Sequence, residues 1–290
     1  DVLGSRGLGD VYKRQVLNQG IDACVNWNDR VGEDFTYNLG FNITFTKNKL
    51  RKTDELSNIE DYRKSIGQPT SAILGWQSQG LFGKDVAIAG HPFQSFGNYQ
   101  VGDIAYADLN NDGMVDNNDQ TRIGQSFPKT TLGVDITLNY KGFGLYVLGT
   151  ATTGVTQMLT STYYWNKGLD GYSVLAEDRY HPINNPTGTQ PRLTTTSGVN
   201  NYRNSTFWTK NGSFFRLKNV ELSYTLNNNS KKGIGKNYKF FVRGANLFVL
   251  SGIKELDPEL MLAGITNYPV YRTITGGISI NSVSYTHLTL

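Results

Sequence analysis

Disulfides, long apolar runs and a strong net charge are all missing from this 290-residue chain. Its one cysteine, Cys24, cannot form an internal disulfide, so cysteine usage says little about the compartment. No stretch approaches 18 consecutive apolar residues, which excludes a transmembrane helix. The net charge of +4 is mild, and no Lys/Arg-rich run with interleaved aromatics occurs, so we expect no nucleic-acid partner.

Glycine and aromatic residues are abundant instead. The chain has 32 Gly, 17 Tyr and 14 Phe, and Asn and Thr recur throughout, a composition that favours strands and turns over helices. The mean hydropathy of −0.40 resembles that of a soluble protein. It does not exclude a membrane barrel, because only alternate residues of a barrel strand face lipid.

Both ends of the chain look foreign to the rest. Residue 1 is Asp and no signal peptide follows it. Residues 5–15 (SRGLGDVYKRQ) resemble translated sequencing-adapter read-through, and residues 283–290 (VSYTHLTL) resemble its counterpart. The alternative is that both ends are native. We expect residues 1–15 and 283–290 to be non-native, and residues 16–282 to be a fragment of a longer protein.

Strict alternation of apolar and polar residues is the strongest pattern in the sequence. Over Phe35–Thr46 every odd position is apolar and every even position is polar or Gly, and Thr131–Lys141 alternates as cleanly. Strands of soluble sandwiches average about 5–6 residues, whereas membrane-spanning strands need about 9–11. The runs here belong to the longer class, and their Thr, Asn, Asp and Gly side suits a hydrated lumen.

The alternation predicts seven strands. In chain order they are Leu17–Asn28, Phe35–Asn48, Thr131–Lys141, Gly142–Thr150, Ser213–Leu226, Tyr238–Leu250 and Val270–Asn281. The phase slips by one near Lys218-Asn219, and a β-bulge there would keep both halves of that strand facing the same side.

Short and long connections alternate along the chain. Short turns fall near 28–34, 141–142 and 227–237, and long connections run over about 48–130, 151–211 and 251–268. Outer-membrane barrels show this segregation, with short periplasmic turns and long outer loops. The expected fold is therefore all-β, the C-terminal portion of a large transmembrane β-barrel with long extracellular loops. Seven strands cannot close such a barrel, so the rest is expected upstream.

A calcium-loop pattern occupies residues 108–119. Asp108, Asn110 and Asp112 would supply side-chain oxygens at positions one, three and five, and Gly113 permits the sharp turn at position six. The remaining predicted ligands are the carbonyl of Met114, then Asp116 at position nine and Asp119 at position twelve. The alternative is an Asn/Asp/Gly-rich turn that binds no ion. We expect a bound Ca²⁺ to be structural.

Several segments together resemble SusC/RagA TonB-linked outer-membrane proteins. The segments are 102–116 (GDIAYADLNNDGMVD), 201–208 (NYRNSTFW), 211–226 (NGSFFRLKNVELSYTL), 246–248 (NLF), 257–259 (DPE) and 268–272 (YPVYR). The block around 201–226 is the most diagnostic, and the resemblance covers nearly all of the native-looking region. The family normally ends in an aromatic residue after a segment like 277–281, where this chain has Ser282.

The resemblance implies a barrel of about 22 strands with a plugged lumen. It implies TonB-dependent import of a nutrient, a glycan or peptide, across the outer membrane of a Gram-negative bacterium. The implied partners are a SusD-like surface lipoprotein that acts as a lid, the TonB complex through the missing N-terminal plug, and outer-membrane lipid. No residues suggest an enzyme, because His91 and His181 are isolated and no nucleophile elbow is apparent.

Aromatic residues in the longest loop could stack on sugar rings or meet the lid. The candidates for ligand contact are Tyr163, Tyr164, Trp165, Tyr172 and Trp208. The alternative is that they pack the loop on itself. Two rival functions stay open. One is a soluble or secreted calcium-binding β-domain such as a glycan-binding module, and the other is a non-transporting surface adhesin barrel.

Overall fold

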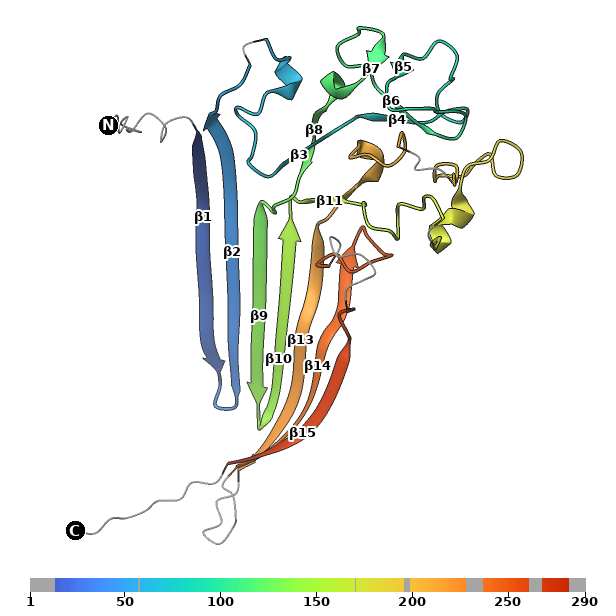
Figure 1. The fold of residues 1–290 in the computed structure, drawn as a ribbon. Coiled ribbons are helices and arrows are strands. Elements are labelled where there is room, and N and C mark those ends of the chain that lie inside the picture. The colour runs from blue at the N-terminus through green and yellow to red at the C-terminus, as the bar shows by residue number, and fades with distance from the viewer. Residues whose placement is uncertain are drawn as a thin grey trace, which may run out of the picture.

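The computed structural model describes residues 14–56, 58–169, 171–195, 199–227, 237–260 and 268–281. The protein has two parts, a tall antiparallel sheet and a group of folded loops at one end of it (Figure 1). No described helix is long and apolar enough to cross a membrane. Residues 1–13 and 282–290, which hold almost all of the predicted adapter-derived sequence, lie outside the described residues.

Seven strands form the sheet, and each pairs antiparallel with its neighbours. In spatial order they are β1 (Gln15–Val31), β2 (Phe35–Lys52), β9 (Thr130–Tyr140), β10 (Phe143–Thr153), β13 (Phe214–Asn227), β14 (Asn237–Ser251) and β15 (Thr273–Asn281). This order is the chain order of the seven predicted strands. The prediction of an all-β fold with seven antiparallel strands is therefore confirmed.

The strand ends differ from the predicted ones for local reasons. Lys141 and Gly142 both have positive φ, 47° and 86°, so they form a two-residue turn and β10 begins only at Phe143. The first hairpin is longer than predicted because its pairing continues until Gln15 lies opposite Lys52. Alternation of side-chain polarity stops before the backbone pairing does, so it underestimates these two strands.

The predicted irregularity in β13 is present. Leu217 lies opposite Gly149 of β10 and Asn219 lies opposite Leu148, so Lys218 is an extra residue without a partner in that ladder. The bulge keeps the apolar residues before and after it on one side of the sheet. A strand without it would turn half of its apolar residues to the polar side.

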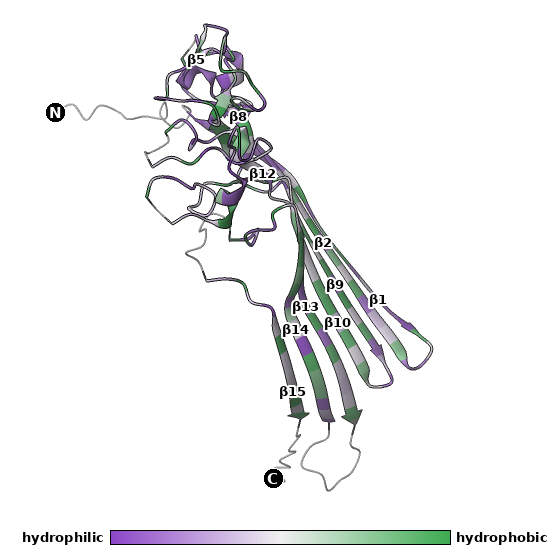
Figure 2. Ribbon diagram, turned by 90° about the vertical axis from the view of Figure 1, so that its right-hand side faces the viewer, coloured by the Kyte–Doolittle hydropathy of each residue, from purple (hydrophilic) through white to green (hydrophobic). Residues whose placement is uncertain are grey.

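The sheet has one apolar and one polar side. Across its middle, Val25 lies opposite Phe41 and Phe41 opposite Val134, and all three are exposed. The neighbouring row on the other side carries polar or small residues, and hydropathy alternates along each strand (Figure 2). From Phe35 to Phe45 the apolar stripe of β2 is roughly 33 Å long, or about 25 Å high at the usual barrel tilt.

Aromatic rings line the apolar side at the short-turn end. Phe35 lies opposite Tyr140, Tyr140 opposite Phe143, Phe143 opposite Tyr224 and Tyr224 opposite Phe240. The rings of Phe143 and Tyr224 are 4.5 Å apart at their centroids. Such a row matches the aromatic girdle that barrel proteins place at a membrane interface.

The long connections fold into a separate unit beyond the other end of the sheet (Figure 1). Its short strands are β3 (Ala72–Gly75), β4 (Ser78–Leu81), β5 (Phe93–Gln94), β6 (Ile104–Tyr106), β7 (Met114–Val115), β8 (Thr121–Gln125), β11 (Thr156–Met158) and β12 (Thr209–Asn211). Its 3₁₀ helices are η1 (Asp61–Arg63), η2 (Asn117–Asp119), η3 (Val174–Asp178) and η4 (Thr206–Trp208). The strands form two-stranded sheets, β3 with β8, β4 with β6, β5 with β7 and β11 with β12.

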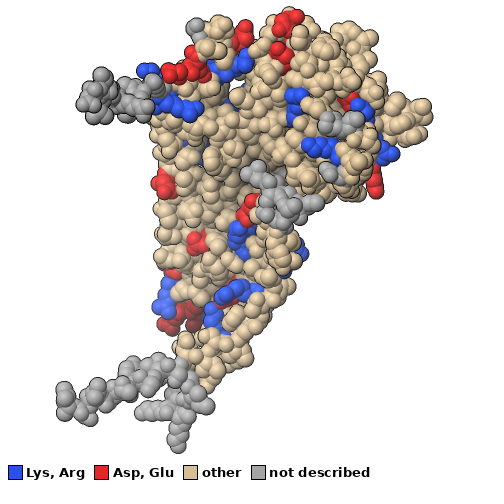
Figure 3. Space-filling model, viewed as in Figure 1, with Lys and Arg blue, Asp and Glu red and all other residues tan. Residues whose placement is uncertain are grey.

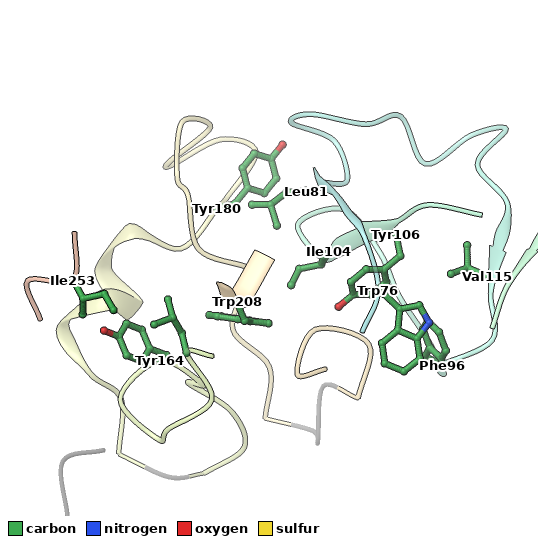
Figure 4. Close-up of a cluster of buried hydrophobic side chains, with 11 residues drawn as sticks. Trp76, Leu81, Phe96, Ile104, Tyr106, Val115, Tyr164, Tyr180, Trp208 and Ile253 are labelled. Carbon is green, nitrogen blue, oxygen red and sulfur yellow. The ribbon is translucent and has the colours of Figure 1, made fainter. Parts of the chain in front are cut away.

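The packed hydrophobic core of the described chain lies in these loops, not in the sheet (Figure 4). We call it the outer-loop core. Its buried members are Trp76, Leu81, Phe96, Ile104, Tyr106, Val115, Leu159, Tyr164, Tyr180, Trp208 and Ile253. They come from three connections far apart in sequence, so the loops form one packed unit.

Candidate functional site

A buried polar network joins two of the long loops. Asn201, 1 % exposed, accepts a hydrogen bond from the backbone N–H of Ile104 at 2.9 Å and donates one to Asp103 at 2.7 Å. Its carbonyl accepts the indole N–H of Trp208 at 2.7 Å. Arg192 neutralises the buried Asp103 through contacts of 2.8 and 3.1 Å. Asn201 thus links β6 to η4.

A second amide pair completes the network. The Gln94 amide nitrogen donates to Asn200 at 2.6 Å and to the Ile104 carbonyl at 3.1 Å. The Gln94 side-chain oxygen accepts the N–H of Tyr106 at 2.7 Å, and the Tyr106 hydroxyl donates to the carbonyl of Asn200 at 2.8 Å. These hydrogen bonds join segments 94–106 and 200–208. Residues 201–208, part of the SusC/RagA-like sequence, therefore have a structural role.

An ion-pair cluster ties the third long loop to the wall. Arg216 of β13 is buried, and its guanidinium contacts both carboxylate oxygens of Asp257 at 2.6 and 2.7 Å. Its Nε lies 3.4 Å from Glu259, which also pairs with Lys218 at 2.9 Å. The Asp257-Pro258-Glu259 segment thus anchors the loop to the bulged strand.

The calcium-type loop is folded by its own hydrogen bonds. Asp108 accepts the N–H of Gly113 through Oδ2 at 2.9 Å, and Asp119 accepts the N–H groups of Leu109 and Asp116 at 2.7 and 2.8 Å. Gly113 has φ 85°, which supplies the expected sharp turn. Asp119, at position twelve, is fully buried. Its hydrogen bond to the Leu109 N–H joins the end of the loop to its start.

The loop fits a cation in part. Oδ1 of Asp108 is buried without a hydrogen-bond partner, so it can face an ion. Asn110 Oδ1 and Asp112 Oδ1 each accept one backbone N–H two residues further on, which leaves lone pairs free on both oxygens. Among the described residues, however, no three His, Cys, Asp or Glu side chains converge as a metal group. Closer approach of Asp108, Asp112 and Asp116 would be needed to coordinate Ca²⁺.

The five aromatic candidates divide by burial. Tyr164 and Trp208 are 3 % and 2 % exposed and belong to the outer-loop core, so neither presents a ring face to a ligand. Tyr163 and Trp165 are half-buried and pack against that core. Tyr172 remains exposed and donates its hydroxyl to the carbonyl of Gly168 at 2.6 Å. Packing therefore accounts for most of this aromatic cluster.

A cavity of about 730 Å³ lies where the outer ends of β1, β2 and β9 meet the loops. Its strand residues include Asn18, Thr46 and Asn48, which the alternation places on the polar side of the sheet. Lys47, Arg122 and Lys129 line it, and no acidic residue does. Sequence patterns missed this cavity because its walls come from four separate segments.

Sequence comparison finds relatives that are TonB-dependent receptors. The chain is 27 % identical over 289 residues to TonB-dependent receptor P26 of Formosa agariphila, covering 91 % of the chain and 29 % of that protein. It is 25 % identical over 269 residues to TonB-dependent receptor SusC of Bacteroides thetaiotaomicron, covering 89 % and 25 %. The chain thus spans less than a third of these relatives. No family model matches it.

Structure comparison finds the same architecture. The RagAB peptide transporter superposes with a TM-score of 0.67 at 19 % identity, over 91 % of this chain and 29 % of that one. The RagAB peptide importer in the 'open-open' state gives 0.66 at 18 %, over 91 % and 28 %. Fold and sequence relatives agree over the same share of the chain. The chain is therefore a SusC/RagA-like TonB-dependent receptor sequence.

Proposed function

We propose that this chain supplies one wall and three outer loops of a TonB-dependent importer that carries a glycan or peptide across the outer membrane of a Gram-negative bacterium. The observation that carries the proposal is the two-sided sheet, whose exposed apolar stripe has the height of a barrel's lipid-facing band. A soluble calcium-binding module would leave that apolar side in water, which disfavours the rival function.

In this proposal the polar side of the sheet lines the lumen, and the cavity at its outer end contributes to the substrate path. Arg122 and Lys129 there, with no acidic residue, favour anionic or polar groups. The loops packed around the outer-loop core present their outer surface to a SusD-like lipoprotein lid. The TonB complex acts on a plug encoded upstream, and the substrate moves without covalent chemistry.

The test is uptake by the complete receptor in its native host. A strain lacking the gene should fail to import a fluorescent glycan or peptide that the wild-type strain accumulates, and the gene should restore uptake only when TonB is functional. Restoration without TonB, or a complete reading frame that lacks a plug, would contradict the proposal. Co-purification with a SusD-like lipoprotein tests the partner separately.

We further propose that the loop 108–119 binds one structural Ca²⁺ through oxygens of Asp108, Asn110, Asp112, Met114, Asp116 and Asp119. The unpartnered Oδ1 of Asp108 and the left-handed turn at Gly113 support the proposal. Bound Ca²⁺ would draw the exposed oxygens together and neutralise their charge. It would also stiffen the segment around Asp116, whose backbone carbonyl accepts a hydrogen bond from the Trp76 indole at 2.8 Å.

Calcium binding is tested by limited proteolysis of the purified receptor in Ca²⁺ or in chelator. Ca²⁺ should slow cleavage within 108–119, and Asp108→Asn should abolish that protection. Asp61→Asn, in an exposed neighbouring loop, is the matched control and should keep it. Equal cleavage rates in Ca²⁺ and chelator for the unaltered receptor would show that the loop is only a hydrogen-bonded turn.

A further inference from the structure

The apolar side of β2 changes character at one height. Its outward residues are apolar from Phe35 through Phe45, and the next two outward positions are Lys47 and Lys49. Arg51 and Lys52 follow at the end of the strand. The change from rings and aliphatic groups to ammonium and guanidinium groups is therefore confined to the outer end of the strand.

The pairing register fixes which way these side chains point. Lys47 lies opposite Gln19 and Lys49 opposite Leu17, in the same face as the pair of Ile21 and Phe45. On its other side β2 pairs with β9 only as far as Phe45, so the four basic residues stand beyond the end of β9. All four are exposed, and the upper left corner of Figure 3 shows Lys and Arg side by side with Asp and Glu.

Nearby carboxylates do not neutralise the four basic residues. Within the described chain none of them makes an ion pair. The next two acidic residues in the chain are Asp54 and Glu55, so segment 47–55 carries four positive and two negative charges. Glu55 accepts the backbone N–H groups of Ser65 and Ile66. Asp54 is exposed just past the end of β2. A surplus of positive charge therefore remains at this height.

At the opposite end of the sheet, the two short turns that the structure describes have balanced charges. Arg30 and Lys141 there are matched by Glu33 and Asp34, and Lys141 lies 3.4 Å from Asp34. The Arg30 guanidinium donates to the Glu33 carbonyl at 2.6 Å. Among the described residues of the β1–β2 hairpin, an excess of positive charge therefore remains only at the end on the side of the long loops.

We propose that Lys47, Lys49, Arg51 and Lys52 bind the phosphate groups of phosphorylated lipid headgroups in the outer leaflet. The inference rests on the proposed outer-membrane location. Apolar stems of Lys and Arg can lie along the upper apolar row while their charged ends reach the headgroup layer. Exposed cations at this boundary gain attraction from an anionic surface, and Arg can hold phosphate through two N–H groups.

The experiment uses the complete receptor in detergent, titrated with lipid A that carries its phosphates. Replacing Lys47→Gln and Lys49→Gln together should weaken binding roughly 30-fold, about fivefold for each charge. The matched control is Lys84→Gln with Lys254→Gln, which removes the same charge from exposed outer-loop positions. The control should bind as the unaltered receptor does. Lipid A stripped of phosphate should bind both double variants equally, and inorganic phosphate should not compete at equal concentration.

Assembly is scored on the same samples by heat-modifiable migration. The site is supported if the Lys47→Gln, Lys49→Gln double variant keeps its heat-modifiable migration but binds lipid A more weakly. Equal binding of phosphorylated lipid A by both double variants overturns it, and the importer proposal is unaffected. If the unaltered receptor showed no heat-modifiable migration, that result would instead refute the barrel on which the importer proposal stands. Efficient competition by inorganic phosphate would identify a free-anion site and overturn the lipid assignment.

Discussion

Replacing Asn201 by Ala should open the outer loops locally without dissolving the barrel wall. Asn201 reaches from the 199–208 segment to β6, where its amide holds the N–H of Ile104 and the carboxylate of Asp103. Both partners are almost completely buried, so water cannot replace the lost hydrogen bonds. The variant therefore leaves the buried N–H of Ile104 without a partner and removes one hydrogen bond from the buried carboxylate of Asp103.

The magnitude follows from those two losses. An unsatisfied buried N–H costs about 1–3 kcal/mol, and the lost hydrogen bond to the charged Asp103 about 1.5–3 kcal/mol. Arg192 still pairs with Asp103 at 2.8 Å, which places the second loss near its lower limit. We expect the free energy of local opening to fall by about 3–4 kcal/mol, equivalent to a roughly 200- to 900-fold faster exchange of the affected amides.

Hydrogen exchange of the complete receptor, read by mass spectrometry, measures this change directly. Peptides covering 103–106 should exchange faster in Asn201→Ala, whereas peptides from β9 should keep their protection. Asn98→Ala, which alters an exposed asparagine in the same loop as residues 103–106, is the control and should change the exchange of neither set of peptides. Unchanged exchange at Ile104 in Asn201→Ala would refute the view that this network holds the loops together.

Two further predictions concern the loop anchor and the loop core. Asp257→Ala leaves the buried Arg216 with only the 3.4 Å contact to Glu259, so we expect the 252–260 segment to open about 3 kcal/mol more easily and to be cleaved faster by protease, while Arg216→Met combined with Asp257→Leu should restore resistance. Burial raises the pKa of Tyr202 to about 12 from an ordinary value of 10.0. The folded loops favour the neutral Tyr202 hydroxyl, because the pKa is higher in the folded state than in the unfolded state. The stability that this gives the loops is complete below pH 10 and is lost as the pH rises through the folded-state pKa. Protease resistance of the loops should therefore fall in that window, and less so in Tyr202→Phe; an identical fall in both would contradict the assignment.

The wall could be predicted from sequence because its determinants are local. Strict alternation over Phe35–Thr46 identifies a two-sided strand before any partner is known. The phase slip at Lys218 likewise marks the bulge, since the apolar side must be kept across it. Neighbouring strands in the sheet are also consecutive among the long strands of the chain, so the order followed directly.

The outer loops could not be predicted because their contacts are distant in sequence. Asn201 and Ile104 are 97 residues apart, and Gln94 and Asn200 are 106 apart. Nothing in the local pattern near Trp208 distinguishes a ring that stacks on a ligand from one that is buried beneath other loops. The Arg216–Asp257 pair likewise joins a strand to a loop 41 residues away.

The central claim is that one side of this sheet faces lipid and the other faces a lumen. Phe41 and Asn42 are adjacent residues near the middle of β2 and point to opposite sides. The decisive measurement is the fraction of complete receptor that reaches heat-modifiable form when each is replaced by Arg. Phe41→Arg should lower assembly, at a cost of about 2–4 kcal/mol near the bilayer midplane, whereas Asn42→Arg should be tolerated. Equal assembly of the two variants would contradict the account.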